Sequence, residues 1–271
     1  MSAARPRLAI VVVFVGRAPF YLPAFLVSCR ANPDVQWLLY TDFPVEGAPP
    51  NVTILPTTLA ALRARFSDAV GVEVPLHPKK ICDLKPVYGV AFADALRGYD
   101  FWAHADMDVV WGDLRRFVTD DRLAVTDVFS SRPDKLSGHF TLFRNVEPIN
   151  RLFERIPDMH ALMADKTHLK IDEKAMTKTL RQTVDHAPRG EAPRVYWEEE
   201  LTVNAEYQRA LGDGPSDALW WREGRTFAAD GRELMYVHFH KLKPHMTTVD
   251  FSATDEVRAF SISRRGLLRA G

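Results

Sequence analysis

Cysteine, net charge and long apolar stretches are all scarce in this sequence. Its 271 residues include only two cysteines, Cys29 and Cys82, too few for a disulfide framework or a thiolate metal site, so we expect a reducing, cytoplasmic compartment. The 35 basic and 35 acidic side chains cancel, which removes any global attraction to nucleic acid or anionic membranes. We therefore expect no nucleic-acid partner, while peripheral membrane contact stays open.

The apolar run over residues 8–15 is much shorter than the ~20 residues that cross a bilayer. It suits a parallel strand that is buried on both faces, so we expect no transmembrane segment here. Strand and helix signals then alternate through the first half of the chain, which predicts βαβ units. The predicted fold class is α/β, with a mixed, mostly parallel central sheet flanked by helices and a Rossmann-like nucleotide-binding half.

Several elements can be placed within this pattern. Apolar residues at helical spacing predict a helix over 19–30, and a second helix should run from Asp83, as its cap, to Gly98. Further helices are expected over 146–156 and 172–184, and Asp230-Gly231 predicts a two-residue hairpin turn. We predict one domain over residues 1–245 and a tail over 246–271, either a frayed terminus or a short basic amphipathic end.

Two carboxylates, Asp106 and Asp108, directly follow the strand expected over 101–104. In open α/β sheets ligands bind beyond the carboxyl ends of the strands. Strand alternation places both carboxylates on one side and Met107 in the core. Mg²⁺ and Mn²⁺ bind through one or two carboxylates together with substrate phosphates. Asp-x-Asp also occurs by chance on solvated turns, but the apolar residues on both sides favour a functional site for a metal and a diphosphate.

The segment 98–114, GYDFWAHADMDVVWGDL, resembles the DxD segment of a bacterial family of glycosyltransferases with the GT-A fold. Other segments resemble that family in the same order: the first strand, helix and second strand over 14–42, KICDLKPVYG at 80–89 and SGHFTLFRN at 137–145. The resemblance covers most of residues 8–245. It implies a GT-A fold, a nucleotide-sugar donor, most often a UDP-sugar, a Mn²⁺ or Mg²⁺ ion, and a saccharide, lipid-linked or small-molecule acceptor.

The resemblance also implies roles for individual residues. Asp106 would contact the ribose or the metal, and Asp108 would ligate the metal. The other implied contacts are Phe14 and Gly16 with the nucleobase, Thr41 and Asp42 with the nucleoside, and Lys85 with phosphate or donor sugar. A solvent-exposed lysine is the alternative for Lys85.

Residues 238–244, HFHKLKP, are similar to a His-then-Lys-Pro element of DxD glycosyltransferases. There the histidine completes the metal site and the lysine holds the diphosphate. We favour His238 over His240 as the ligand, and an imidazole shifts the preference toward Mn²⁺. Lys241 and Lys243 are the candidate diphosphate contacts. A polar surface strand is the alternative.

The second half of the chain offers further candidates. Gly138 would let the backbone approach a ligand, and His139 is either a catalytic residue or a histidine at the edge of the core. Asp172 and Glu173 open an expected helix, either as a catalytic base or donor-sugar contact, or only because acids suit a helix N-terminus. Tryptophans 197, 220 and 221 could form an acceptor platform or belong to the core.

Two other functions remain open at this stage. A sugar-phosphate nucleotidyltransferase would carry a glycine-rich basic loop after the first strand, and Gly16-Arg17 is only a weak counterpart. A metal- and nucleotide-binding partner subunit without turnover would be expected to lack a metal ligand. The sequence therefore favours a metal-dependent glycosyltransferase.

Overall fold

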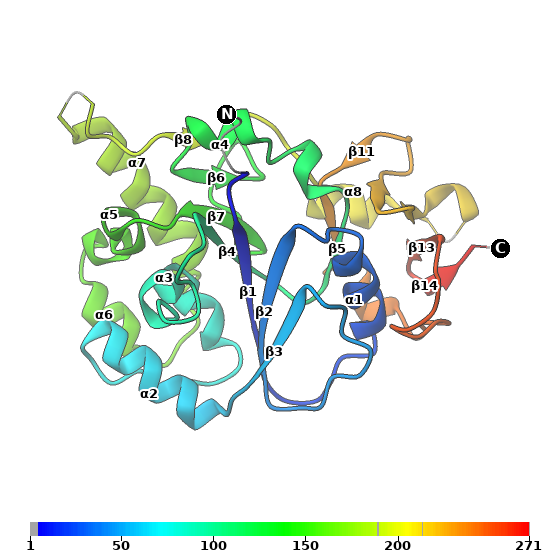
Figure 1. Ribbon diagram of the computed structural model, residues 1–271, viewed down its shortest axis with the longest axis horizontal. Helices are drawn as coiled ribbons and strands as arrows, with labels where there is room; N and C mark the ends of the chain where they lie inside the picture. The colour runs from blue at the N-terminus through cyan, green and yellow to red at the C-terminus, as the bar shows by residue number, and fades with distance from the viewer. Residues whose placement is uncertain (1–4, 189, 213, 271) are drawn as a thin grey trace.

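A seven-stranded sheet forms the centre of the molecule in the computed structural model, which describes residues 5–188, 190–212 and 214–270 (Figure 1). The strand order is β3-β2-β1-β4-β7-β6-β8. Its strands are β1 (Leu8–Phe14), β2 (Val35–Thr41), β3 (Val52–Pro56), β4 (Phe101–Ala105), β6 (Val128–Ser130), β7 (Phe140–Arg144) and β8 (Val195–Tyr196). Only β7 runs antiparallel to its neighbours, β4 and β6. The predicted fold class, a mixed, mostly parallel sheet flanked by helices, is confirmed.

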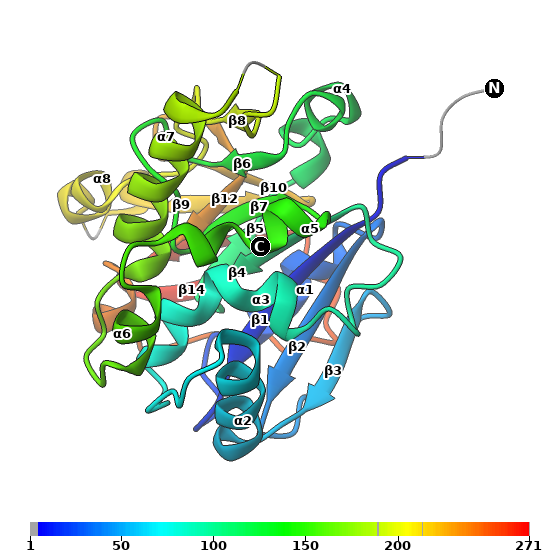
Figure 2. The ribbon, with the colours of Figure 1, turned by 90° about the vertical axis from the view of Figure 1, so that its left-hand side faces the viewer.

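Both faces of this sheet are covered, which explains why β1 is apolar at every position. Ile10 and Val12 belong to the core on one face, and Ala9 and Val11 to the core on the other. The first face packs against α1 (Leu22–Arg30) and the C-terminal strands, and the second against α2 (Leu59–Val70) and later helices (Figures 1 and 2).

Short helical segments make up most of the second face. They are η1 (Lys80–Val87), α3 (Tyr88–Ala91), α5 (Glu147–Asn150), η3 (Leu152–Arg155), α6 (Met159–Ala164), the π-helix η4 (Ile171–Ala175) and α7 (Met176–His186). The remaining short helices are η2 (Leu114–Arg116), α4 (Asp120–Ala124), α8 (Ala205–Ala210), η5 (Pro215–Asp217) and η6 (Lys243–His245). None of the helices in the described ranges is both long and apolar enough to cross a bilayer.

The helix predicted from Asp83 to Gly98 is wrong in its form. The chain makes a 3₁₀ helix and then one short α-helix, because Pro86 has no N–H to donate to a regular α-helical ladder. Asp83 does not cap this segment, since its carboxylate accepts N–H groups from Leu169 at 2.8 Å and Ile171 at 3.0 Å. The helix expected over 146–156 is likewise split between α5 and η3, and the one expected over 172–184 begins with a π turn.

A buried ion pair lies within η1, and its lysine also links η1 to α6 and to the segment before η4. Lys80 and Asp83 have fully buried side chains and lie 3.1 Å apart, and Lys80 also donates to the carbonyl of Leu162 at 3.0 Å. We expect Lys80→Met to lower the free energy of unfolding by about 3–5 kcal/mol, because it leaves the Asp83 charge buried without its partner. The matched control is Lys79→Met, an exposed neighbour that should change it by less than about 0.5 kcal/mol. Equal urea midpoints for the two variants would show that the pair does not stabilise the fold.

Five strands between residues 219 and 269 form a second sheet on the α1 side. Its order is β11-β10-β9-β13-β14, from β9 (Leu219–Arg222), β10 (Arg225–Phe227), β11 (Glu233–Leu234), β13 (Ala259–Ser263) and β14 (Gly266–Arg269). The prediction of a frayed end is wrong for residues 246–270, because β13 pairs with β9 and Phe260, Ile262 and Leu267 are fully buried.

The hairpin predicted around Asp230-Gly231 is present but longer than expected. Residues 228–232 connect β10 to β11, and the N–H of Ala228 donates to the carbonyl of Arg232 at 2.8 Å. The following strand β12 (Tyr236–His238) leaves this sheet and pairs with β5 (Val109–Trp111). That separate pairing brings the C-terminal histidines to the end of β4.

Candidate active site

The acidic pair lies in a bend between β4 and β5, at the carboxyl end of β4. Met107 is buried in the core, as predicted, so both carboxylates project from the opposite side of the bend. The antiparallel register pairs Val109 with His238, which delivers the imidazole beside Asp108. The Asp108 carbonyl also accepts the N–H of Phe239 at 3.2 Å. Two strands far apart in sequence thus fix one site.

Asp106, Asp108 and His238 form a candidate metal centre. One ligand atom from each lies within 4.8 Å of the others. His238 Nε2 is 3.2 Å from Asp108 Oδ1 and 3.7 Å from Asp106 Oδ2. Two carboxylates and one imidazole suit Mn²⁺, for which nitrogen donors are better ligands than for Mg²⁺. The residues therefore fit a divalent ion of this kind.

Two lysines contact the acidic pair, one at each carboxylate. Lys85 Nζ lies 2.5 Å from Asp106 Oδ1, and donates to the Gly138 carbonyl at 2.6 Å. Lys243 Nζ lies 2.5 Å from Asp108 Oδ2. Lys85 is buried, so the solvent-exposed alternative for it is wrong. Burial alone would lower the pKa of Lys85, but the neighbouring Asp106 raises it well above its usual range.

The Asp108 carboxyl is held in its charged form by its neighbours. Burial would raise its pKa, but His238 and Lys243 outweigh burial and hold the pKa well below its usual range. A carboxylate that stays ionised is the form that ligates a metal ion.

Asp172 and Glu173, on the π-helix, face the site from the second side of the sheet. A Cβ atom at position 138 would lie only 2.7 Å from Asp172 Oδ2, so Gly138 allows this carboxylate to approach the backbone. Asp172 Oδ2 is also 3.8 Å from Lys85 Nζ. Burial raises the pKa of Asp172 to about 7, although Lys85 opposes the shift. Asp172 and Asp106 therefore share Lys85 as a neighbour, and both Asp172 and Glu173 line the same cavity as Asp106.

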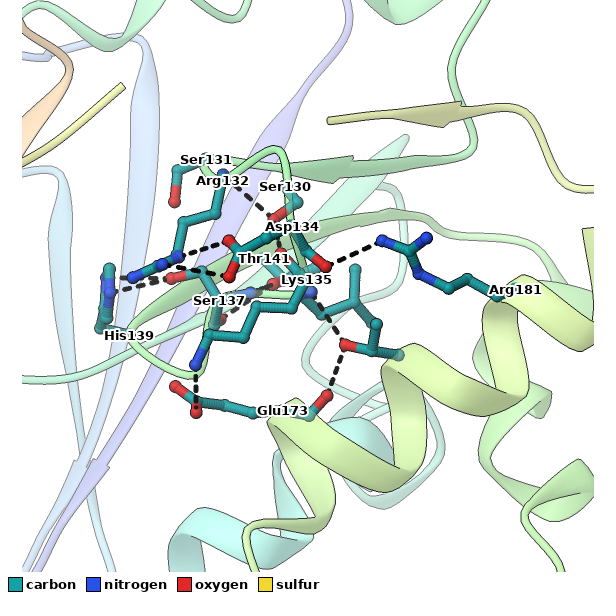
Figure 3. Close-up of polar contacts among 12 residues, drawn as sticks. Ser130, Ser131, Arg132, Asp134, Lys135, Ser137, His139, Thr141, Glu173 and Arg181 are labelled. Carbon is teal, nitrogen blue, oxygen red and sulfur yellow. Dashed lines mark hydrogen bonds and ion pairs between the residues drawn. The ribbon is translucent and has the colours of Figure 1, made fainter. Parts of the chain in front are cut away.

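Glu173 differs from its neighbour because its carboxylate accepts a hydrogen bond from a lysine. Lys135 donates to Glu173 Oε2 at 2.7 Å (Figure 3). Burial would raise the pKa of Glu173, but this hydrogen bond outweighs burial and lowers it. Of the two carboxyls, only Asp172 can change its charge near neutral pH.

His139 belongs to a polar cluster beside His238, the candidate metal ligand. Its ring stacks on the His238 ring with centroids 4.3 Å apart, and its Nδ1 lies 2.7 Å from the Tyr236 hydroxyl. The same Nδ1 lies 3.0 Å from Ser137 Oγ (Figure 3). Tyr236 in turn lies 2.6 Å from Ser131 Oγ. Burial first, and then His238, lower the pKa of His139 well below its usual range. A neutral His139 is placed to orient His238.

Two cavities meet at the acidic pair. The larger, of about 400 Å³, is lined by Asp106, Gly138, His139, Asp172, His238 and Lys241, among others. The smaller, of about 240 Å³, includes Phe14, Tyr21, Asp108 and Lys243. Lys85 and Asp106 line both cavities. The site therefore has two compartments on either side of the candidate metal centre.

The remaining predicted nucleoside contacts lie beside the smaller cavity without lining it. The Gly16 N–H donates to Asp42 Oδ1 at 2.7 Å, which ties the loop after β1 to the loop after β2. Thr41 is buried. Their contacts with a nucleoside stay predictions, since neither cavity formed by the described residues includes Gly16, Thr41 or Asp42.

Two tyrosines at the site were not among the sequence candidates. Tyr21 lines the smaller cavity, and Lys243 Nζ lies 5.7 Å from the centre of its ring. Tyr236 could have been found from strand alternation, because it precedes His238 by two residues on one strand face. The tryptophans do not form an acceptor platform in the described cavities, and Trp221 donates to the Trp111 carbonyl within the core.

The chain matches a family of unknown function (DUF6625) over residues 10–270. No curated protein matches it. Among solved structures it is similar to the galactosyltransferase LgtC in complex with donor and acceptor sugar analogues, with a TM-score of 0.46, 10% identity, and coverage of 85% of this chain and 86% of that chain. It is also similar to mouse xyloside xylosyltransferase 1 in its apo form, with a TM-score of 0.46, 10% identity, and coverage of 85% and 97%. The assignment of function therefore rests on the residues of the site.

Proposed function

The chain belongs to this family of unknown function (DUF6625), and we propose that it is a metal-dependent glycosyltransferase of the GT-A type. It would move a sugar from a nucleotide-sugar donor, a UDP-sugar, to a saccharide, lipid-linked or small-molecule acceptor. One observation carries this proposal: the ligand atoms of Asp106, Asp108 and His238 lie within 4.8 Å of one another, between two cavities at the carboxyl end of β4.

These three residues would hold Mn²⁺, or Mg²⁺ in its place. When bound, the ion neutralises negative charge that develops on a diphosphate leaving group. The two carboxylates roughly balance one divalent ion, so a diphosphate still needs cationic partners from the chain. Lys85 and Lys243 both line the smaller cavity and are placed to supply them. Lys241 lines the larger cavity instead, so we assign the diphosphate to Lys243 and not to Lys241.

The smaller cavity is the proposed nucleotide compartment, with Phe14 and Tyr21 as the aromatic walls for the base and ribose. The larger cavity would then take the donor sugar and the acceptor. Asp172 lines it and has a pKa raised by burial to about 7, so it is the candidate to accept the proton of the acceptor hydroxyl.

The metal ligand can be tested by comparing two stacked histidines, whose ring centroids are 4.5 Å apart. We expect His238→Ala to weaken Mn²⁺ and UDP binding together by at least about tenfold, because only His238 lies with the two carboxylates. His240→Ala, the matched control, should stay within about threefold of the wild type. Calorimetric titration of both variants with Mn²⁺ and then UDP measures this. An unchanged His238→Ala profile, or a larger loss in His240→Ala, would reject the assignment of His238.

Transfer itself is tested with a panel of sugar nucleotides in the presence of Mn²⁺. The proposal expects nucleoside diphosphate to be released from at least one UDP-sugar, and release that persists unchanged in EDTA would contradict metal dependence.

A further inference from the structure

The larger cavity has more basic than acidic residues in its wall. Its acids are Asp106, Asp172 and Glu173. Its lysines and arginines are Lys85, Arg132, Lys135, Lys170, Arg209 and Lys241. The whole chain has equal numbers of basic and acidic residues, so this excess is local.

Half of these cations are already paired. Lys85 contacts Asp106, and Lys135 contacts Glu173 at 2.7 Å. Arg132 contacts Asp134 at 2.9 Å, as Figure 3 shows for the loop between β6 and β7. Lys170, Arg209 and Lys241 form no ion pair with any residue in the described part of the chain.

The three remaining cations come from three separate parts of the fold. Lys170 directly precedes η4, Arg209 lies on α8, and Lys241 follows β12. Convergence from three elements means that no single charged helix face explains the cluster.

The backbone at Lys170 is also unusual. Its φ is 58°, in the left-handed region that a lysine seldom adopts. The buried Asp83 carboxylate accepts the N–H groups on both sides of it, from Leu169 at 2.8 Å and Ile171 at 3.0 Å. Such strained positions persist where the surrounding structure determines them, and they cluster at ligand sites. The fold therefore fixes the backbone of Lys170 at the wall of this cavity.

We infer that the larger cavity takes a saccharide that carries an anionic group, a carboxylate or a phosphate, bound by Lys170, Arg209 and Lys241. The saccharide part of this inference rests on the proposed function. The donor diphosphate does not account for these cations, because Lys85 and Lys243 serve it in the smaller cavity. Charge-assisted hydrogen bonds from lysine and arginine suit carboxylate and phosphate oxygens. The anionic group can belong to the acceptor or to the donor sugar.

The test compares the wild type with a triple variant, Lys170→Gln, Arg209→Gln and Lys241→Gln. The control is Lys174→Gln, an exposed lysine on η4 that does not line the cavity. Calorimetry with glucose 6-phosphate and glucose, with and without UDP and Mn²⁺, tests an anionic acceptor. The same titration with UDP-glucuronic acid and UDP-glucose tests an anionic donor. Thermal unfolding checks that every variant is folded.

We expect the wild type to bind at least one anionic probe about tenfold more tightly than its neutral counterpart. The triple variant should lose this preference and keep its UDP affinity within about threefold, and Lys174→Gln should behave as the wild type. A preference for glucose 6-phosphate assigns the anion to the acceptor, and a preference for UDP-glucuronic acid assigns it to the donor sugar. Equal binding of charged and neutral probes, or an unchanged preference in the triple variant, would overturn the inference.

The two proposals can fail separately. Glucose 6-phosphate is titrated without UDP as well, so the absence of UDP binding would count against the glycosyltransferase while the anionic site is still decided by its own probe.

Discussion

Asp108→Asn is expected to lower sugar transfer by roughly 10³-fold while leaving the fold intact. The Asp108 carboxylate lies 3.2 Å from His238 Nε2 and is almost fully buried, so it is the more buried of the two acids at the candidate metal centre. Asparagine keeps the volume of the side chain and removes the charge that a divalent ion requires. The measurement is nucleoside diphosphate release from UDP-sugars at saturating Mn²⁺.

The matched control for this variant is Asp68→Asn, which removes an exposed aspartate on α2. Its transfer rate and its unfolding temperature should equal those of the wild type. Near-normal turnover of Asp108→Asn, with contaminating metal strictly excluded, would show that the acidic pair does not bind the catalytic ion.

Asp172→Asn is expected to lower kcat by roughly 10²–10⁴-fold, the usual contribution of a general base. Burial raises the pKa of Asp172 to about 7, and only its ionised form can accept a proton. The wild-type rate should therefore rise with pH through about 7 and level off above it. The variant should have the lower kcat at every pH and show no rise through pH 7, since an amide does not ionise.

Glu173→Gln is the matched control, because its hydrogen bond from Lys135 keeps the pKa of Glu173 low and its charge constant near neutral pH. We expect it to retain the rise in rate through pH 7. Asp172→Asn would contradict the role as a base if it kept the wild-type pH profile. A donor complex with both acids more than roughly 10 Å from the anomeric carbon would contradict it too. Either result would leave Asp172 and Glu173 with only the role of acids at a helix N-terminus.

The parts of the fold that depend on residues close together in the sequence could be predicted from it. The apolar run that forms β1 and the acids that follow β4 are local patterns, and both were placed correctly. The helix from Asp83 was not, because the partners of Asp83 are Leu169 and Ile171, 86 and 88 residues away. Strands β13 and β14 were missed for a similar reason, since Phe260 of β13 pairs with Trp221 of β9, 39 residues away in the sequence.

The same division applies to the candidate site. Recognisable sequence motifs contain Asp106, Asp108 and His238. The pairing of Val109 with His238 brings these three residues together. No sequence motif marks the basic residues that line the larger cavity. Lys170 and Arg209 are ordinary residues in sequence, and only the folded chain places them in one cavity wall with Lys241.

In the proposed mechanism, a divalent ion links the acidic pair to the diphosphate of a UDP-sugar. The most direct measurement is the thermal and chemical unfolding of the wild type with UDP in Mn²⁺ and again in EDTA. With UDP at a hundredfold over its Kd, we expect about 2.7 kcal/mol of added stability in Mn²⁺ and almost none in EDTA. The same stabilisation by UDP in both solutions would contradict it.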